Sequence, residues 1–179
     1  GANTSVLSKN AKIGPLVDAF GAMTYGGTKP PVAVNAIEAT PQSNNINMTW
    51  NVTTDPDDKK AYGFLLVAAK DKSLLSSMNP ASVPQGVASA VVMTEALKAG
   101  EQISGTIADL DFNQKYNVAV FAFDYNRNWS PISPIKEVQT EANNAPVIST
   151  GYDGDFRVKS HETLKVNYSI TDPDSHTMD

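Results

Sequence analysis

Apolar and polar residues alternate along several short stretches between residues 29 and 141. The clearest case is NINMTWNV, whose apolar positions are Ile46, Met48, Trp50 and Val52. Because successive side chains of a strand point to opposite faces, this alternation predicts a strand with one buried and one solvated face. Further stretches of this kind, separated by turn-forming residues, are AYGFLLVAAK, ISGTIADL, YNVAVFAF and SPIKEVQT. Short strands punctuated by turns over about 100 residues predict an antiparallel β-sandwich.

A helical pattern stands apart from these strands near the start of the chain. Its apolar positions recur at helical spacing and are Leu16, Val17, Phe20 and Met23. Such positions share one face of a helix, and Gly14-Pro15 and Gly26-Gly27 are typical start and stop signals. The pattern predicts a short amphipathic helix, so residues 1–28 are interpreted as a helix and a linker that precede the strands of residues 29–141.

Four features of the middle segment resemble the fibronectin type III domain. Trp50 ends the alternating run of the second strand, where that family buries a tryptophan. Leu110 precedes Tyr116 by six residues, a spacing similar to that family's tyrosine corner. YNVAVFA resembles the penultimate strand, and AFDYNRNWSPIS resembles the bacterial form of the final turn, with Arg127 where glycine is common. The resemblance implies a fibronectin type III-like β-sandwich over residues 29–141.

Two parts of this segment predict less regular structure. A first strand is expected from the apolar positions Val32, Val34, Ile37 and Ala39. The stretch from Asp71 to Gly100 is longer than that family usually carries. It predicts an edge strand near residues 88–93 and a short helical turn near residues 95–98.

A second strand pattern begins after residue 141. Its alternating apolar positions are Leu164, Val166, Tyr168 and Ile170. The phrase TDPD comes directly after this pattern at residues 171–174, as it does after the earlier strand at residues 54–57. Residues 142–179 therefore resemble the start of a second, partial sandwich of immunoglobulin or cadherin-like type. Because two or three strands cannot close a core, we expect the chain to be part of a longer protein.

Composition narrows the classes of function. The chain has 179 residues, of which 41% are hydrophobic, as is typical of globular proteins. A net charge of −5 with scattered basic residues argues against a nucleic-acid partner. The absence of cysteine removes disulfides, thiol catalysis and cysteine zinc sites, and it favours a bacterial over a eukaryotic extracellular source. No stretch of the sequence approaches the roughly 20 apolar residues of a membrane span.

No catalytic constellation is present in the sequence. The two histidines, His161 and His176, both lie in the last segment, and no G-x-S-x-G elbow occurs. Two groups of carboxylates could instead ligate calcium, namely Asp55, Asp57 and Asp58, and Asp172 with Asp174. Neither loop has the full calcium-loop spacing, and Asp and Pro also form ordinary turns. We therefore expect no catalytic, cofactor or metal residue, with calcium at Asp55/Asp57 or Asp172/Asp174 as the alternative.

The second face of two strands indicates one possible interface. The residues opposite the expected core side are apolar in both AYGFLLVAAK and YNVAVFAF, which are neighbours in a sandwich. They are Leu65, Val67, Ala119, Phe121 and Phe123. An apolar patch of this size marks a contact surface if it is open. The alternative is that residues 71–100 fold back over it.

The N-terminal stretch GPLVDAFGAM resembles the last helix of the catalytic domain of subtilisin-like serine proteases (subtilases). The residues at corresponding places are Gly14, Leu16, Val17, Asp18, Ala19 and Ala22, while Pro15 and Leu16 replace the small residues usual there. In bacterial secreted members of that family, accessory β-sandwiches commonly come after this helix. The resemblance implies that the catalytic triad and the oxyanion hole lie upstream of residue 1.

These observations support two functional interpretations. The first is a non-catalytic C-terminal accessory region of a secreted or surface-attached bacterial subtilisin-like protease, serving spacing, docking, or substrate or surface contact. Its partners would be the upstream catalytic domain and the downstream sandwich of the same chain. The alternative is an adhesion or carbohydrate-binding module of another bacterial envelope protein. There, outward aromatic rings of Tyr125 and Trp129 would stack on sugars, although the same rings could pack against the neighbouring sandwich.

Overall fold

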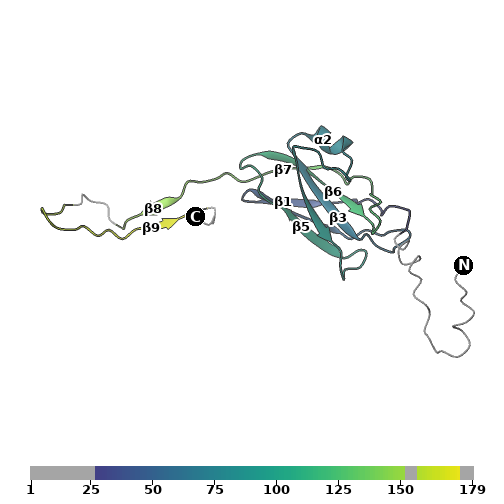
Figure 1. Ribbon diagram of the computed structural model, residues 1–179, viewed down its shortest axis with the longest axis horizontal. Coiled ribbons are helices and arrows are strands. Elements are labelled where there is room, and N and C mark those ends of the chain that lie inside the picture. The colour runs from purple at the N-terminus through teal and green to yellow at the C-terminus, as the bar shows by residue number, and fades with distance from the viewer. Residues whose placement is uncertain (1–26, 152–156, 174–179) are drawn as a thin grey trace, which may run out of the picture.

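The computed structural model describes residues 27–151 and 157–173 of the chain. The helix predicted from Leu16, Val17, Phe20 and Met23 lies outside the described residues. Figure 1 shows two packed sheets, and beyond them along the chain the short strands β8 and β9. Within the described part of the chain, no helix has the length and apolar character that crossing a membrane requires.

All strand pairs of the two large sheets are antiparallel. One sheet has the order β1-β2-β5, with β1 (Glu38–Gln42), β2 (Asn45–Asn51) and β5 (Gln102–Ile107). The other has the order β4-β3-β6-β7, with β4 (Val87–Met93), β3 (Gly63–Ala69), β6 (Lys115–Phe123) and β7 (Lys136–Gln139). Three antiparallel strands packed against four form a fibronectin type III-like sandwich. The predicted all-β fold class is confirmed.

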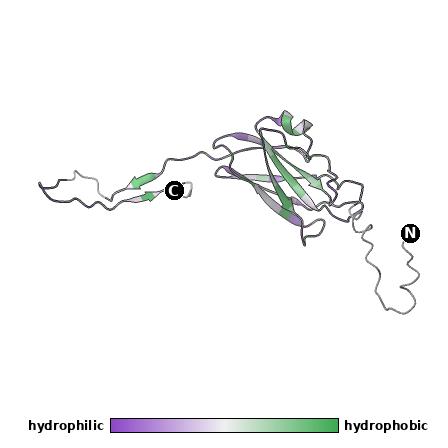
Figure 2. Ribbon diagram, viewed as in Figure 1, coloured by the Kyte–Doolittle hydropathy of each residue, from purple (hydrophilic) through white to green (hydrophobic). Residues whose placement is uncertain are grey.

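The main core lies between these two sheets and contains the alternating residues of β2. Ile46, Met48 and Trp50 are all buried. The ring of Trp50 meets that of Phe64 from the facing sheet edge-on, with centroids 5.3 Å apart, an arrangement that aromatic pairs favour. Figure 2 shows hydrophobic residues concentrated in the strands. The period of two in the sequence thus predicts the buried face of β2 correctly.

The tyrosine corner expected from the spacing of Leu110 and Tyr116 is present. The backbone amide of Asp111 donates a hydrogen bond to the hydroxyl of Tyr116 at 3.1 Å. Both Leu110 and Tyr116 are buried. The corner therefore fixes the connection between β5 and β6 against the start of β6.

Replacing Tyr116 with phenylalanine is expected to lower the free energy of unfolding by about 1–2 kcal/mol, because the amide of Asp111 loses its acceptor in a part-buried position. Urea denaturation measures the difference. The matched control is Tyr168→Phe. Tyr168 is 68% exposed, so the loss of its hydroxyl should change the free energy of unfolding by less than about 0.5 kcal/mol. Equal effects of the two substitutions would contradict a stabilising corner.

The first strand begins later than the apolar pattern predicts. Pairing starts at Glu38, and residues 32–37 form no ladder. Val34 and Ile37 are nonetheless buried in the main core. They stand three residues apart, a spacing that does not place two side chains on the same face of a strand. The pattern therefore identifies core residues correctly but assigns them to the wrong backbone structure.

Residues 71–100 contain one expected element and one that the sequence pattern does not predict. The edge strand is β4, which pairs with β3 along its whole length. The unpredicted element is the helix α2 (Lys72–Ser77), capped by Asp71, whose side chain accepts a hydrogen bond from the amide of Ser73 at 2.8 Å. The helical turn expected near residues 95–98 is wrong: Glu95 has a φ of 46°, which is incompatible with a right-handed helix.

The last segment forms less structure than its pattern predicts. Only β8 (Val147–Ser149) and β9 (Ser169–Thr171) pair there among the described residues, although the alternation begins at Leu164. Leu164 and Tyr168 lie outside any strand and are exposed. Two strands give an apolar face nothing to pack against. The partial second sandwich over residues 142–179 stays a prediction, as do the boundaries at residues 28 and 141.

Candidate functional site

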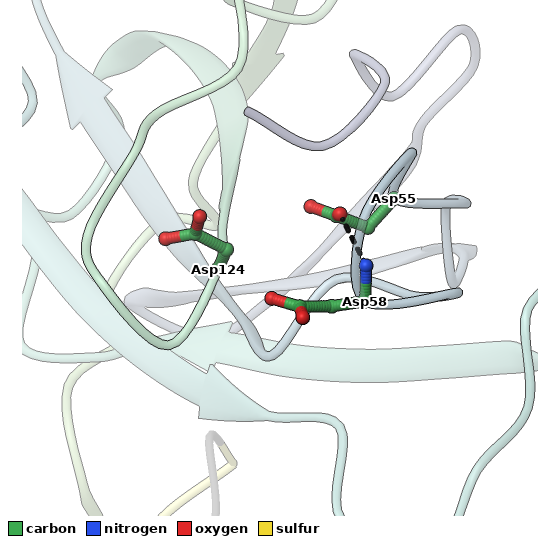
Figure 3. A group of neighbouring side chains, drawn as sticks. All are labelled: Asp55, Asp58 and Asp124. Atoms are coloured by element: carbon green, nitrogen blue, oxygen red, sulfur yellow. Dashed lines mark hydrogen bonds between the residues drawn. The ribbon is translucent and has the colours of Figure 1, made fainter. Parts of the chain in front are cut away.

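Three aspartates come together at one end of the sandwich. Asp55 and Asp58 lie in the loop between β2 and β3, and Asp124 directly follows β6. Because Gly63 pairs with Phe123, the start of β3 lies beside the end of β6, and the two loops meet. One carboxylate oxygen from each aspartate lies within 4.8 Å of the other two. Figure 3 shows the three carboxylates grouped in this way; we call them the aspartate cluster.

Two of the three carboxylates are held in place by hydrogen bonds. Oδ1 of Asp55 accepts from the backbone amides of Asp57 and Asp58, each at 2.8 Å. Asp124 accepts from Asn128 twice, through Oδ1 from the amide at 2.7 Å and through Oδ2 from the side-chain Nδ2 at 2.6 Å. These bonds shape the two loops, and they fix the positions of Asp55 and Asp124.

Two further oxygens of the cluster are buried and lack hydrogen bonds. Asp55 is 5% exposed and Asp124 is fully buried. Among the described residues, nothing donates a hydrogen bond to Oδ2 of Asp55 or to Oδ2 of Asp58. A buried carboxylate oxygen without a partner is energetically costly, so this arrangement calls for a proton or a cation.

The electrostatic environment of Asp58 reflects this crowding. Burial raises the pKa of Asp58 above its usual value, and the neighbouring charges of Asp55, Asp124 and Asp57 raise it further. All three neighbours are acidic, so they disfavour the ionised form of Asp58 together.

Asp57, which is not a member of the cluster, binds the segment that leads into the sandwich. Its Oδ2 accepts from the backbone amides of Thr28 at 2.7 Å and Lys29 at 3.1 Å. These two hydrogen bonds lower the pKa of Asp57 below its usual value. On the other side, Nδ2 of Asn126 donates to the carbonyl of Gly27 at 3.0 Å. The two loops that contain the aspartate cluster therefore also form hydrogen bonds with residues 27–29.

The predicted acidic pairs differ from the observed cluster. The sequence groups Asp55 with Asp57 and Asp58, whereas the structure joins Asp55 and Asp58 to Asp124 and leaves Asp57 out of the cluster. Sequence reasoning misses Asp124 as a member because it lies far from the others along the chain. One signal in the sequence could have identified Asp124. It ends the apolar stretch YNVAVFAF, and this stretch is expected to neighbour AYGFLLVAAK, the strand that follows Asp58. Of the second pair, Asp172 is half-buried after β9, and Asp174 lies outside the described residues.

The five residues of the possible interface are buried. Leu65 and Phe121 are each 4% exposed, and Val67, Ala119 and Phe123 are fully buried. The first four belong to a second apolar cluster on the outer face of the four-stranded sheet, with a cover from the same chain. Its cover residues are Leu74, Leu75, Met78, Trp129, Ile132 and Ile135. The face is therefore not an open contact surface. Residues 71–100, the alternative cover, contribute α2 to it, and residues 129–135 contribute the rest.

Residues 129–135 are attached to β6 through two serines. Ser130 donates its amide to the carbonyl of Ala122 at 2.9 Å, and its hydroxyl accepts from the amide of Ala122 at 2.9 Å. Ser133 bonds the amide and carbonyl of Val120 in the same way, at 2.9 and 3.0 Å. Each serine precedes a proline, which has no amide to contribute. The repeated Ser-Pro pairs thus hold the cover along β6 without a regular strand.

The two aromatic rings of the turn after β6 point differently. Tyr125 is 61% exposed and lies edge-on to Tyr62, with centroids 5.2 Å apart. Trp129 is half-buried and packs on Phe123 at 5.0 Å. Arg127 has a φ of 65°, which explains why glycine is common at this turn position, and its guanidinium lies 4.2 Å from the centre of the Phe123 ring. Trp129 therefore belongs to the sandwich and does not form an outward platform with Tyr125.

The histidines are placed at the far end of the chain. His161 is exposed, and His176 lies outside the described residues.

Comparisons with known proteins give a likeness of fold. No protein-family model and no curated protein sequence matches the chain. Among solved structures, the chain is similar to the FN5 domain of Drosophila Lar, at 15% identity and a TM-score of 0.42, over 63% of this chain and 98% of that one. It is also similar to the fn3 domain of human collagen alpha-1(XX), at 19% identity and a TM-score of 0.41, over 68% of this chain and 92% of that one. A third similar structure is the PKD domain of an M14-like peptidase from a Thermoplasmatales archaeon, at 18% identity and a TM-score of 0.38, over 64% and 99% of the two chains. The strand order described above makes the chain a fibronectin type III-like β-sandwich module.

Proposed function

We propose that this chain is a non-catalytic accessory region that lies C-terminal to the catalytic domain of a secreted or surface-attached bacterial subtilisin-like serine protease. Its role is to hold a fixed spacing between that catalytic domain and the downstream sandwich, and to dock against the catalytic domain. The sequence support is the resemblance of GPLVDAFGAM to the closing helix of subtilases. The upstream catalytic domain and the downstream sandwich are the partners in this proposal.

One structural observation carries the docking role. Asp57 and Asn126 bind the backbone of residues 27–29 directly from the two loops at this end of the sandwich. The connection from the preceding segment is therefore attached to the sandwich at its first described residues. A module joined to the preceding domain only by a flexible linker would not require these hydrogen bonds.

Labelling of the complete gene product with a fluorophosphonate probe tests the protease proposal. We expect one labelled serine, located upstream of residue 1 in the peptide map, and no label within residues 29–141. The label should disappear when the protein is pre-treated with a serine protease inhibitor. A complete protein that takes no label, or a label inside this chain, would overturn the proposal.

The second candidate, a carbohydrate-binding module, has weaker support from the geometry. Stacking on a sugar needs an exposed ring, and of the two rings expected for that role only Tyr125 is exposed. A glycan array with Tyr125→Ala as the control variant distinguishes the two functions, since the accessory region should give no signal that depends on Tyr125.

A further inference from the structure

The aspartate cluster brings three carboxylates together, and the role of these residues in forming turns does not explain this convergence. Turns formed by Asp and Pro need one carboxylate oxygen to accept backbone amides, as Oδ1 of Asp55 does. They do not need three carboxylates from two loops to converge. Asp58 in particular is half-buried against Asp55 and Asp124, where like charges repel.

The second observation is the unpartnered oxygen of Asp55. This side chain is 95% buried, since only 5% of its surface is exposed, and its Oδ2 receives no hydrogen bond from any described residue. Figure 3 shows that oxygen on the side of the carboxylate that faces Asp124, away from the oxygen bonded to the amide of Asp58. A buried acceptor directed into a group of acceptors is stabilised by a proton or a cation between them, and a cation can satisfy all three carboxylates at once.

No side-chain cation of the described residues fills that place. Lys70, Lys115 and Lys136 form ion pairs with carboxylates outside the cluster, namely Asp111, Glu137 and Glu38. Lys60, in the same loop as Asp58, donates instead to the carbonyls of Glu95 and Leu97. Arg127, in the same turn as Asp124, lies over the ring of Phe123.

We propose that Asp55, Asp58 and Asp124 bind a calcium ion. Hard divalent cations prefer carboxylate oxygens, and calcium tolerates irregular geometry with ligands about 2.3–2.6 Å away. Two ligands on opposite sides of such an ion lie roughly 4.6–5.2 Å apart. The separation of no more than 4.8 Å among the three ligand oxygens is compatible with that range. Magnesium holds its ligands at about 2.0–2.1 Å in a near-ideal octahedron and usually keeps several waters, so three carboxylates from two irregular loops suit calcium better.

The bound ion would hold together the same two loops that form hydrogen bonds with residues 27–29. It would join the loop before β3 to the turn after β6, and these carry Asp57 and Asn126 respectively. Calcium would therefore stiffen the junction between the sandwich and the segment that precedes it. This inference does not depend on whether that segment ends a protease domain.

The test is thermal unfolding of the chain after removal of metal with a chelator. Millimolar calcium chloride is expected to raise the melting temperature by about 5 °C, since a ligand that binds only the folded state stabilises it. Isothermal titration calorimetry should give one ion per chain. The same concentration of magnesium chloride should shift the melting temperature less, and an equal shift with magnesium would overturn the assignment to calcium.

Asp58→Asn is the decisive variant, because no hydrogen bond between described residues depends on Oδ2 of Asp58. Without metal it should melt at or above the temperature of the unchanged chain, since one repelling charge is gone. With calcium its melting temperature should not rise. A variant that retains the full calcium shift, or an unchanged chain that neither shifts nor binds in the calorimeter, would overturn the proposal.

Two matched controls locate the ion. Asp109→Asn removes an exposed carboxylate elsewhere on the sandwich and should keep the full calcium shift. Asp172→Asn removes one of the two aspartates of the second acidic pair and should also keep the full calcium shift. If Asp172→Asn abolishes the shift while Asp58→Asn retains it, the calcium site is in the last segment and the proposal is wrong.

Discussion

Replacing Phe121 with alanine is expected to lower the free energy of unfolding by about 3–5 kcal/mol, the range for deleting a fully packed aromatic side chain. Phe121 is 4% exposed although it lies on the outer face of its sheet. It packs in the second apolar cluster, beneath α2 and residues 129–135. The substitution would leave a cavity between the sheet and this cover. Urea denaturation followed by fluorescence measures the change.

Val91→Ala is the matched control for Phe121→Ala. Val91, Leu65 and Phe121 lie opposite one another on β4, β3 and β6, so their side chains share one face. Val91 is 54% exposed, because the cover does not extend to this position of β4. Its truncation should change stability by about 0.5 kcal/mol or less. Similar small effects at both positions would show that the cover does not pack on the sheet.

The covered face marks the limit of what the sequence can predict. Leu65 and Phe121 are identifiable as an apolar second face, because every residue of β3 is apolar or glycine and the strand cannot have a solvated side. The identity of the cover is not accessible in the same way. Helix α2 has 6 residues, too few for a helical period to stand out, and only Leu75 is buried within it. The sequence of residues 129–135 predicts only a turn and the start of a strand. Its two Ser-Pro pairs interrupt any apolar periodicity, so nothing in it indicates that the segment covers the sheet.

The aspartate cluster shows the same limit for a site. Asp55 and Asp58 stand close in the sequence and form one acidic group there, but a loop contains no information about which distant loop it meets. The register that places Gly63 opposite Phe123 brings Asp124 to them. Strand alternation predicts which face is buried, whereas register depends on the whole pairing. Fold class is therefore predictable from local pattern, and the membership of the cluster is not.

Replacing Gly105 with valine is expected to lower the free energy of unfolding by about 2–3 kcal/mol, as overpacking a dense core does. Gly105 lies in β5 at a position where a side chain would point toward the other sheet. A Cβ at this position would lie 2.5 Å from Cγ2 of Val92 and 2.9 Å from Cδ2 of Leu66, closer than carbon atoms approach. The glycine therefore permits the close packing of Val92 and Leu66 against β5, and any side chain here must displace these residues or push the two sheets apart. Thermal and urea denaturation both measure the loss.

Two further variants separate overpacking from a general effect on β5. Ser104→Val places the same side chain on the adjacent, exposed position of the strand, where its higher β-propensity should leave stability equal or slightly improved. Val92→Ala removes the methyl group that lies nearest to the new side chain. Combined with Gly105→Ala, it should cost less than the sum of the two single substitutions, because contacting residues are not additive. Strict additivity would mean that the loss at Gly105 comes from the strand backbone, and the close approach of the sheets would then not be the reason for glycine.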